Sequence, residues 1–430
     1  MSRASFGRHF GLLTRERSFR SLFLATLGSG LGTWLALVAL QIDVLRETDH
    51  SPAWISALLI ADILPMLVLG LVAGPLVDRL SRRGVMIGAD LVRLAVFATL
   101  PFATNAVTII ALAAVAGAAS GFFRPAVYSG LPNLVSDADL PRANSLLQTI
   151  DNSTWAVGSL AGGALVAAEG PHLAYALNAL TFLVSATLLA RIPQRLLQEA
   201  KAPTRGHWRD LADGFVLVRR SRALLTVLFA WSVGMIANAF VNVGEPFLAT
   251  ESFSAGSFGL GLMMACAGLG LAMGAFLAGA WIEERGLPNV YGASLGLMAI
   301  GVGGAAAAPN VWVASACVVI SGAGNGSAIV CNALLVQRGT PDRLRGRAFT
   351  VLMSSTTVML TAGMVVAGRL THAVGPRWIW GLAAMLSAAA AVIGFTLARG
   401  VRERPSETAV GPLPTGFERE PAIEAHSRSA

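Results

Sequence analysis

Residues 54–77 read WISALLIADILPMLVLGLVAGPLV, and this apolar run ends in the basic loop DRLSRRG at positions 78–84. A helix needs about 20 apolar residues to cross a bilayer, and runs of this kind recur along the chain. Of the 430 residues, 54% are hydrophobic and 13% are charged, which is about half the charge of a soluble protein. The sequence therefore predicts an all-α polytopic membrane protein.

Turn residues divide the apolar sequence into twelve runs, each long enough for one transmembrane helix. The expected spans are 20–43, 54–77, 85–103, 106–128, 144–168, 172–191, 223–248, 257–281, 288–307, 310–336, 348–369 and 377–398. Around them we expect a cytoplasmic N-terminal segment (1–19), an N-terminal six-helix half (20–191), a cytoplasmic linker (192–222), a C-terminal six-helix half (223–399) and a disordered cytoplasmic tail (400–430). The tail is poor in apolar residues and rich in proline, glutamate, arginine and serine, a composition typical of disorder.

The basic residues predict how the helices are oriented. Of the 32 basic residues, 28 fall in the N-terminal segment, the even-numbered loops and the tail, or at the span ends that adjoin them. Because basic residues stay on the cytoplasmic side, we expect a multi-pass protein of the cell (inner or plasma) membrane with both termini inside. The net charge of +8 then reflects topology and contact with membrane lipid, so no nucleic-acid partner is expected.

Short motifs repeat along the chain at one spacing. Gly74-Pro-Leu-Val-Asp78, after the second span, has a counterpart at Gly279-Ala-Trp-Ile-Glu283 after the eighth. Arg142, before the fifth span, has a counterpart at Arg347 before the eleventh, and both offsets are 205 residues. Equal spacing at equivalent loops favours two pseudo-symmetric halves with a substrate site between them, the architecture of a rocking transporter.

The linker between the halves carries apolar residues at helical spacing, namely Trp208, Leu211, Phe215 and Val218. This pattern predicts either an amphipathic helix on the cytoplasmic membrane surface or an ordinary linker helix.

The loop GPLVDRLSRRG at 74–84 resembles the G-x-x-x-D-R-x-x-R-R/K signature of the major facilitator superfamily, at the place between two helices where that family has it. Further matches are Ala89-Asp90-Leu-Val-Arg93, Phe122-Phe123-Arg124-Pro125-Ala126 and the loop 131–144. Together they are similar to the proton-driven macrolide and siderophore efflux proteins of that superfamily. The resemblance implies the major facilitator fold of twelve helices in two halves, working by alternating access.

The signature predicts a conformational latch made of Gly74, Asp78, Arg79, Arg82 and Arg83. The glycine lets helices approach closely, the acid can meet the positive N-terminus of a neighbouring helix, and the arginines can pair with carboxylates or lipid phosphates. The alternative is topological, because three arginines in a short inner loop also satisfy the positive-inside rule. Asp90 and Arg93 can pair with each other on one helix and support this loop.

On the fifth span, Gly158-Ser-Leu-Ala-Gly162 resembles the antiporter signature G-P-x-x-G of the exporter families, with Ser159 in place of the proline. Gly158 and Gly162 form a small-xxx-small face suited to close helix packing. The missing proline removes the kink that the family resemblance implies.

Acids within the apolar runs are candidates for proton coupling, because an ionisable group in hydrocarbon is costly and is functional by default. The candidates are Asp62, Asp151, Glu245 and Asp43. Asp62 lies among apolar neighbours, where a carboxyl can exchange a proton near neutral pH, and the alternative is a hydrogen-bonded structural acid. Asp151 could face the cavity with Arg124 as its partner. Asp43 and Glu245 lie near outer helix ends, either as gates or as residues that reach the interface.

By analogy with the family, the substrate cavity is expected on the first, fourth, seventh and tenth spans. Its candidate residues are Trp34, Gln41, Arg124, Trp231, Asn238, Asn242, Asn325 and Asn332. A lining with few polar groups suits a hydrophobic or amphipathic molecule better than a sugar, which needs many hydrogen bonds.

Three functions fit these features. The favoured hypothesis is proton-coupled export of a hydrophobic or amphipathic small molecule (a drug, antibiotic or siderophore-like compound) by alternating access. The second is uptake of a small nutrient, for which an anion is one option, by the same fold. The third is a non-transporting membrane scaffold, but a scaffold would have no reason to keep acidic side chains in lipid. We expect a monomer without a metal site or cofactor. We expect no enzyme activity either, since the single lysine, Lys201, excludes a GxxxxGK phosphate loop.

Overall fold

The computed structural model describes residues 11–72, 81–197, 217–219, 221–340 and 345–399. This part of the chain is helical and contains no strand. Ten of the helices in it are long and apolar enough to cross a bilayer. Some predicted features lie outside the described residues: Gly74, Asp78 and Arg79 of the signature loop, Trp208, Leu211 and Phe215 of the linker, and the tail 400–430.

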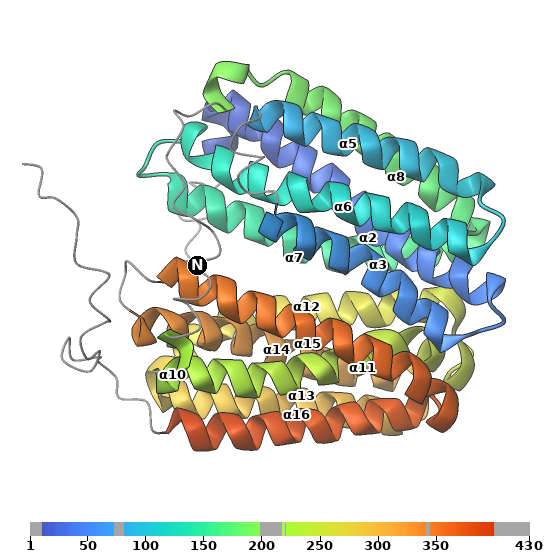
Figure 1. Ribbon diagram of the computed structural model, residues 1–430, viewed down its shortest axis with the longest axis vertical. Helices are drawn as coiled ribbons and strands as arrows, with labels where there is room; N and C mark the ends of the chain where they lie inside the picture. The colour runs from blue at the N-terminus through green and yellow to red at the C-terminus, as the bar shows by residue number, and fades with distance from the viewer. Residues whose placement is uncertain (1–10, 73–80, 198–216, 220, 341–344, 400–430) are drawn as a thin grey trace, which may run out of the picture.

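The helices occupy the predicted spans in order along the chain (Figure 1). They are α2 (Arg17–Glu47), α3 (Pro52–Val72), α5 (Arg82–Thr99), α6 (Ala106–Gly130), α7 (Leu140–Glu169), α8 (Pro171–Ala190), α10 (Arg222–Thr226), α11 (Ser232–Phe247), α12 (Gly256–Arg285), α13 (Leu287–Ala307), α14 (Val311–Gly339), α15 (Arg345–Val374) and α16 (Pro376–Ala398). Turns of π-helix at Val227–Trp231 and Leu248–Ser252 flank α11. Single 3-10 turns lie at Leu100–Phe102, Leu131–Asn133 and Gln194–Leu197.

Two predicted spans fall on helices that are not among the ten. The span 54–77 falls on α3, whose apolar run is the shorter Pro52–Met66. The span 144–168 falls on α7, which carries the polar run Asp151-Asn152-Ser153. Polar residues in a membrane helix are tolerated where they face protein or a water-filled cavity.

Helix ends repeat at the spacing found between the sequence motifs. The side chain of Asn105 caps the start of α6, and that of Asn310, 205 residues later, caps the start of α14. Gly170 before α8 and Gly375 before α16, also 205 residues apart, have φ angles of 80° and 85°. This left-handed conformation favours glycine, and a proline follows each one at the start of the next helix. The repeat therefore extends to how individual helices begin.

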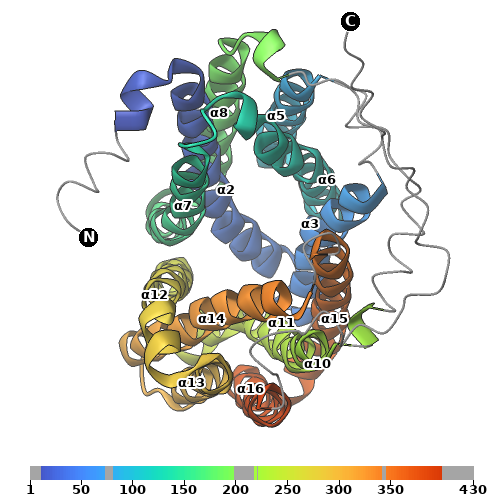
Figure 2. The same cartoon turned by 90° about the vertical axis from the view of Figure 1, so that its left-hand side faces the viewer.

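The helices lie in two groups, α2 to α8 and α10 to α16 (Figures 1 and 2). Within the groups, α2 packs on α7 and α8, and α13 packs on α14 and α16. Between the groups, α7 packs against α12 and α3 packs against α15. We call the end of the molecule at which α2 begins and α16 ends the terminal end, and the opposite end the distal end.

The two groups meet near the distal end through small residues. A Cβ atom added to Gly163 of α7 would lie 2.9 Å from Cα of Gly261 in α12. A Cβ atom added to Gly368 of α15 would lie 2.9 Å from Cβ of Ser56 in α3. Gly163 and Gly368 are 205 residues apart, and so are Ser56 and Gly261. The two crossings are therefore equivalent under the repeat, and small side chains let the backbones touch at both.

The buried core follows the same division. One cluster joins residues of both groups, including Phe97 and Phe182 of the first and Phe247 and Trp380 of the second. Toward the terminal end the core separates into a cluster around Phe19 and Phe123 in the first group and a cluster around Tyr291 in the second. The groups thus share a core distally and separate toward the terminal end.

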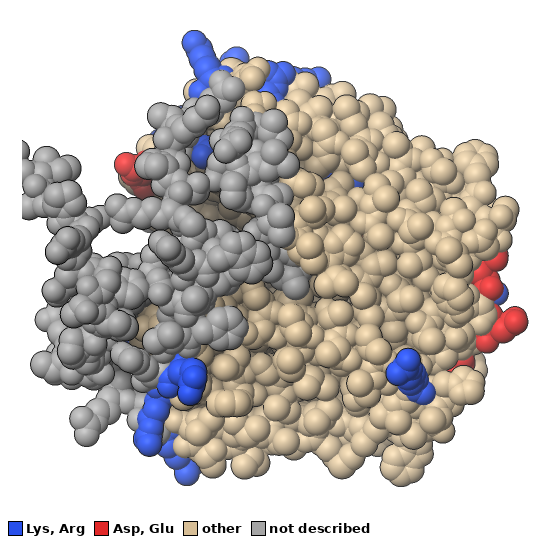
Figure 3. Space-filling model, in the orientation of Figure 1, with Lys and Arg blue, Asp and Glu red and all other residues tan. Residues whose placement is uncertain are grey.

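The surface between the two ends is largely apolar. On the face shown in Figure 3, few charged side chains interrupt a broad uncharged area, and most of the charged side chains lie at its margins. Large apolar side chains are exposed on the outer faces of many helices, and Phe276 and Trp378 are each 72% exposed. An apolar surface of this extent is typical of contact with lipid.

Candidate functional site

A cavity of about 640 Å³ lies between the two helix groups. Gln41, Leu59 and Glu245 line it on the distal side, and Thr26 and Arg124 line it toward the terminal end. The crossings of α7 with α12 and of α3 with α15 lie beyond the lining on the distal side, so they close the cavity there. The volume is within the range of sites for drug-sized molecules.

Most of the residues proposed from sequence for the cavity or for proton coupling lie on its wall. They are Trp34, Gln41, Asp62, Arg124, Asp151, Trp231, Asn238, Asn242, Glu245 and Asn325. Asn242 also donates a hydrogen bond from Nδ2 to Oδ1 of Asn238 at 2.9 Å, one turn earlier on α11. The structure thus brings together side chains from α2, α3, α6, α7, α11 and α14.

Two proposed residues do not line the cavity. Asp43 lies near the distal end of α2, where its Oδ2 accepts a hydrogen bond from the hydroxyl of Tyr175 at 2.8 Å. Asn332 lies two turns beyond Asn325 on α14, beside Cys331 and Leu335 in the core of the second group. Asn332 is 6% exposed and does not belong to the described lining of this cavity.

Arg124 and Asp151 join α6 to α7 at the cavity wall. Nη2 of Arg124 lies 2.6 Å from Oδ2 of Asp151. The hydroxyl of Tyr128 lies 3.3 Å from the same oxygen. The guanidinium group therefore already has a carboxylate partner, and the predicted pairing of these two residues is present.

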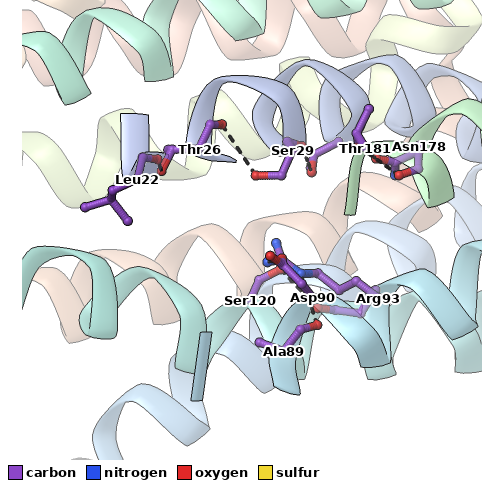
Figure 4. Close-up of polar contacts among 11 residues, drawn as sticks. Leu22, Thr26, Ser29, Ala89, Asp90, Arg93, Ser120, Asn178 and Thr181 are labelled. Carbon is purple, nitrogen blue, oxygen red and sulfur yellow. Dashed lines mark hydrogen bonds and ion pairs between the residues drawn. The ribbon is translucent and has the colours of Figure 1, made fainter. Parts of the chain in front are cut away.

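Asp90 and Arg93 form an ion pair within α5, with 2.5 Å between Oδ1 and Nη2. The guanidinium group also lies 4.4 Å from the ring centroids of both Phe123 and Phe182. Figure 4 shows the pair together with Ala89, whose backbone oxygen accepts a hydrogen bond from Nε of Arg93 at 3.4 Å. Asp90 is fully buried and Arg93 is 6% exposed, yet Arg93 reaches the cavity wall. The pair therefore lies in the helix core behind the cavity, and its support of the signature loop stays a prediction.

Asp62 and Glu245 face the cavity, and neither is paired with a side chain in the described part of the chain. Asp62, on α3, is exposed to the cavity, and Glu245, on α11, is half-buried. Among the described residues, no side chain makes a hydrogen bond or ion pair with either carboxyl. Nor do the described residues contain three His, Cys, Asp or Glu side chains grouped as a metal site. The two carboxyls are therefore available to a proton or to a bound molecule.

Aromatic side chains form part of the wall. The indole rings of Trp34 on α2 and Trp155 on α7 stack with centroids 5.1 Å apart at an interplanar angle of 16°. Trp155 was missed from sequence, although it lies one turn after Asp151 and therefore on the same face of α7. The second group contributes methionines to the wall, namely Met235, Met264, Met298 and Met364. These flexible side chains can adapt to ligands of different shape.

The described part of the signature loop contacts the end of α8. Nη2 of Arg83 donates a hydrogen bond to the backbone oxygen of Ala190 at 2.5 Å. Gly158 and Gly162 of α7 face α2, since Cβ atoms there would lie 2.8 Å from the Leu31 oxygen and 2.6 Å from the Leu35 oxygen. The latch of Gly74, Asp78, Arg79, Arg82 and Arg83 stays a prediction.

Comparison with known proteins places the chain among transporters. Residues 13–414 match the family model of the transmembrane secretion effectors. The uncharacterized MFS-type transporter YfiS of Bacillus subtilis is 27% identical over 85% of this chain and 89% of its own length. The multidrug efflux pump Tap of Mycobacterium tuberculosis is 28% identical over 84% and 88%. The putative bacilysin exporter BacE of Bacillus amyloliquefaciens is 24% identical over 79% and 85%.

Solved structures share the fold. A mutant of the nucleoside transporter NupG has a TM-score of 0.75 at 13% identity, over 88% of this chain and 99% of its own. A bacterial homologue of the iron transporter ferroportin in an inward-facing state has a TM-score of 0.69 at 17% identity, over 89% and 98%. At these identities the likeness concerns the fold alone.

Proposed function

The chain belongs to the transmembrane secretion effector family of the major facilitator superfamily, and from this premise we propose that it exports an amphipathic small molecule in exchange for protons. The protein is a multi-pass membrane transporter of small molecules. The observation that carries the proposal is Asp62, a carboxyl without a partner among the described residues, on the wall of a cavity beyond which the two helix groups cross at small residues.

Alternating access is supported by the internal repeat. The twelve spans form two six-helix halves, 20–191 and 223–399, joined by the linker 192–222. The paired crossings at Gly163–Gly261 and Gly368–Ser56 obey the 205-residue offset. Two symmetry-related contacts that close one end can open together when one half rocks against the other.

The orientation of the molecule follows from its arginines. With basic residues on the cytoplasmic side, the terminal end is cytoplasmic and the distal end faces outside. The described conformation is then inward-facing, with its outer end closed by the small-residue crossings. A substrate would enter the cavity from the cytoplasm or the inner leaflet.

Proton exchange at Asp62 provides the coupling. In the outward-facing state, protons from outside neutralise the carboxyl, and in the inward-facing state the carboxyl releases its proton to the cytoplasm. Glu245 and Asp151 line the same cavity and are further candidates for this exchange. Asp43 is a weaker candidate, because it is hydrogen-bonded to Tyr175 away from the cavity.

The direction of transport is supported by two of the relatives, since BacE is described as a putative bacilysin exporter and Tap as a multidrug efflux pump. The cavity wall supports an amphipathic substrate, because tryptophans and methionines accompany a few polar groups. Uptake of an anionic nutrient finds less support, because Arg124, the residue suggested for binding it, is paired with Asp151.

Everted membrane vesicles test the proposal. The lumen is made acidic, the membrane potential is clamped with potassium and valinomycin, and three lipophilic probes are added: tetraphenylphosphonium, tetraphenylborate and the uncharged dye Nile red. We expect at least one probe to accumulate only while the pH gradient persists, and nigericin to abolish the accumulation. The Asp62→Asn variant should lose it, whereas Glu169→Gln, an exposed acid at the end of α7, should retain it. Absence of gradient-dependent accumulation of every probe contradicts the proposal.

A further inference from the structure

We propose that the cavity selects substrates that carry a positive charge within an apolar body, with the charge held by the carboxyls of Asp62 and Glu245. This inference rests on the proposed export function and specifies which molecules the same site accepts. It is carried by the balance of charges on the cavity wall and by a buried polar atom of the same wall that has no partner among the described residues.

The arginines at the wall are already neutralised. Arg93 is paired with Asp90 and enclosed by two phenyl rings, and Arg124 is paired with Asp151. The described lining contains no other arginine or lysine. An anionic substrate would therefore have to break one of these ion pairs before it gained a positive partner.

Asp62 and Glu245 remain as the uncompensated charges. They come from different helix groups, since Asp62 is on α3 and Glu245 is on α11, and both line the cavity. No described side chain pairs with either of them. A monovalent cation in the cavity would be attracted by both carboxylates and would balance the charge of one of them, and electrostatic attraction is strong where water is partly excluded.

A buried acceptor supports the same assignment. Gln41 lines the cavity, is 4% exposed, and has no hydrogen-bond partner for its Oε1 atom among the described residues. An unsatisfied buried acceptor is costly, and the amide oxygen can be satisfied by an N–H group of a bound molecule. A protonated amine presents this kind of donor together with its charge.

The rest of the wall favours a bulky organic cation over a small hydrated ion. The stacked rings of Trp34 and Trp155 offer aromatic faces to a cation. A cavity of about 640 Å³ is much larger than a metal ion, and no group of three His, Cys, Asp or Glu side chains among the described residues could hold one. The chemistry therefore fits an amine or onium group flanked by apolar substituents.

Cation binding at these carboxyls competes with protons, because only the ionised carboxylate attracts the substrate. Entry of a cation from the cytoplasm would expel the proton carried by the inward-facing state. Protonation from outside would in turn release the cation. The same two residues would then serve substrate binding and proton exchange in different states.

The test uses two ions of the same size and shape and of opposite charge. Equilibrium dialysis of the purified full-length protein at pH 7.5 measures binding of labelled tetraphenylphosphonium and tetraphenylborate. We expect saturable binding of the cation at least tenfold tighter than that of the anion. Asp62→Asn and Glu245→Gln should each weaken cation binding at least tenfold, and Glu169→Gln should leave it unchanged. Gel filtration and thermal melting show whether each variant is folded.

A second measurement needs no variant. Addition of the cation to the protein in weakly buffered solution should release protons, and its affinity should fall as the pH is lowered. Equal or tighter binding of the anion, no saturable binding of the cation, or an affinity that neither pH nor the two substitutions change would overturn the inference. Gradient-driven export of Nile red alone would reject it and leave the proposed function standing. Cation binding without gradient-driven export would support the charge selectivity of the cavity and contradict the proposed export function.

Discussion

Gly163 of α7 and Gly261 of α12 cross at backbone contact, since a Cβ atom on Gly261 would lie 2.8 Å from Cα of Gly163. Its equivalent under the repeat is the crossing of Gly368 with Ser56. These contacts close the distal end of the cavity, and the conformation described here depends on them.

A side chain larger than hydrogen at this crossing should open the distal end. Overpacking of a close contact costs about 1–3 kcal/mol, so Gly261→Ala should shift the population away from the described state by about 5- to 150-fold. The reporter is Leu40→Cys on the cavity wall, in a background without native cysteines. An impermeant maleimide added outside should label this cysteine faster when Gly261→Ala is present than when Gly261 is retained. Gly296→Ala, at a position with open space around it, should leave the rate unchanged. Equal labelling rates for Gly261→Ala and Gly296→Ala would contradict the role of the Gly163–Gly261 crossing in closing the distal end.

Transport should require the ion pair between Arg124 and Asp151 rather than either residue alone. Arg124→Ala leaves a carboxylate without its partner in the wall of the cavity, so we expect transport to fall at least tenfold. The charge-swapped double variant, Arg124→Asp with Asp151→Arg, should recover part of the activity. If the double variant transports no faster than either single variant, the pairing is not what transport requires, and one of the two residues contacts the substrate directly.

The Asp90–Arg93 pair should stabilise the first helix group. Removing one partner of a buried ion pair costs about 3–5 kcal/mol, so Arg93→Met should lower the melting temperature strongly. The double variant with Asp90→Asn should recover part of the loss, because no buried charge is then left alone. Arg191→Met, at an exposed position after α8, is the control. An unchanged melting temperature of Arg93→Met would show that the pair does not stabilise the fold.

Asp139, at the start of α7, should make stability depend on pH. Hydrogen bonds from Ser136 (3.0 Å), Arg15 and Arg142 (2.8 Å) hold the pKa of this carboxyl below its ordinary value. A lowered folded-state pKa stabilises the protein above the unfolded value of about 3.9, and this contribution is lost as the pH falls through the folded value.

Melting curves of Asp139→Asn and the unmodified protein should therefore differ at pH 7 and converge below about pH 4. Asp137→Asn, an exposed acid two residues earlier, should follow the unmodified protein throughout. A difference for Asp139→Asn that stays constant with pH would exclude the charge of Asp139 as its cause.

Local patterns in the sequence predicted the class of the protein and the order of its helices. Apolar length determines where a helix can cross a bilayer, and turn residues determine where it ends, so both can be deduced without knowledge of distant contacts. The repeat was found from two loops, but the equivalent caps at Asn105 and Asn310 and the crossings at Gly163 and Gly368 emerged only with the structure.

Which stretch of each helix borders the cavity was harder to predict. Asn325 and Asn332 are two turns apart on the same face of α14, yet only Asn325 lines the cavity, because the segment around Asn332 packs into the core of its own helix group. Trp155 was missed for the same reason, since its role depends on stacking with Trp34 of another helix. Which acids lack a partner, as Asp62 does among the described residues, is likewise a property of packing between distant segments.

Coupling at Asp62 is tested most directly by proton movement driven by substrate. Proteoliposomes are loaded with the probe that the vesicles transport best, diluted into probe-free buffer at clamped potential, and followed with a trapped pH dye. We predict that outflow of the probe moves protons inward in the unmodified protein, and that in Asp62→Asn the probe still flows out while proton movement is lost. Probe-driven proton movement that is unchanged in Asp62→Asn would contradict the assignment of Asp62 as the coupling residue.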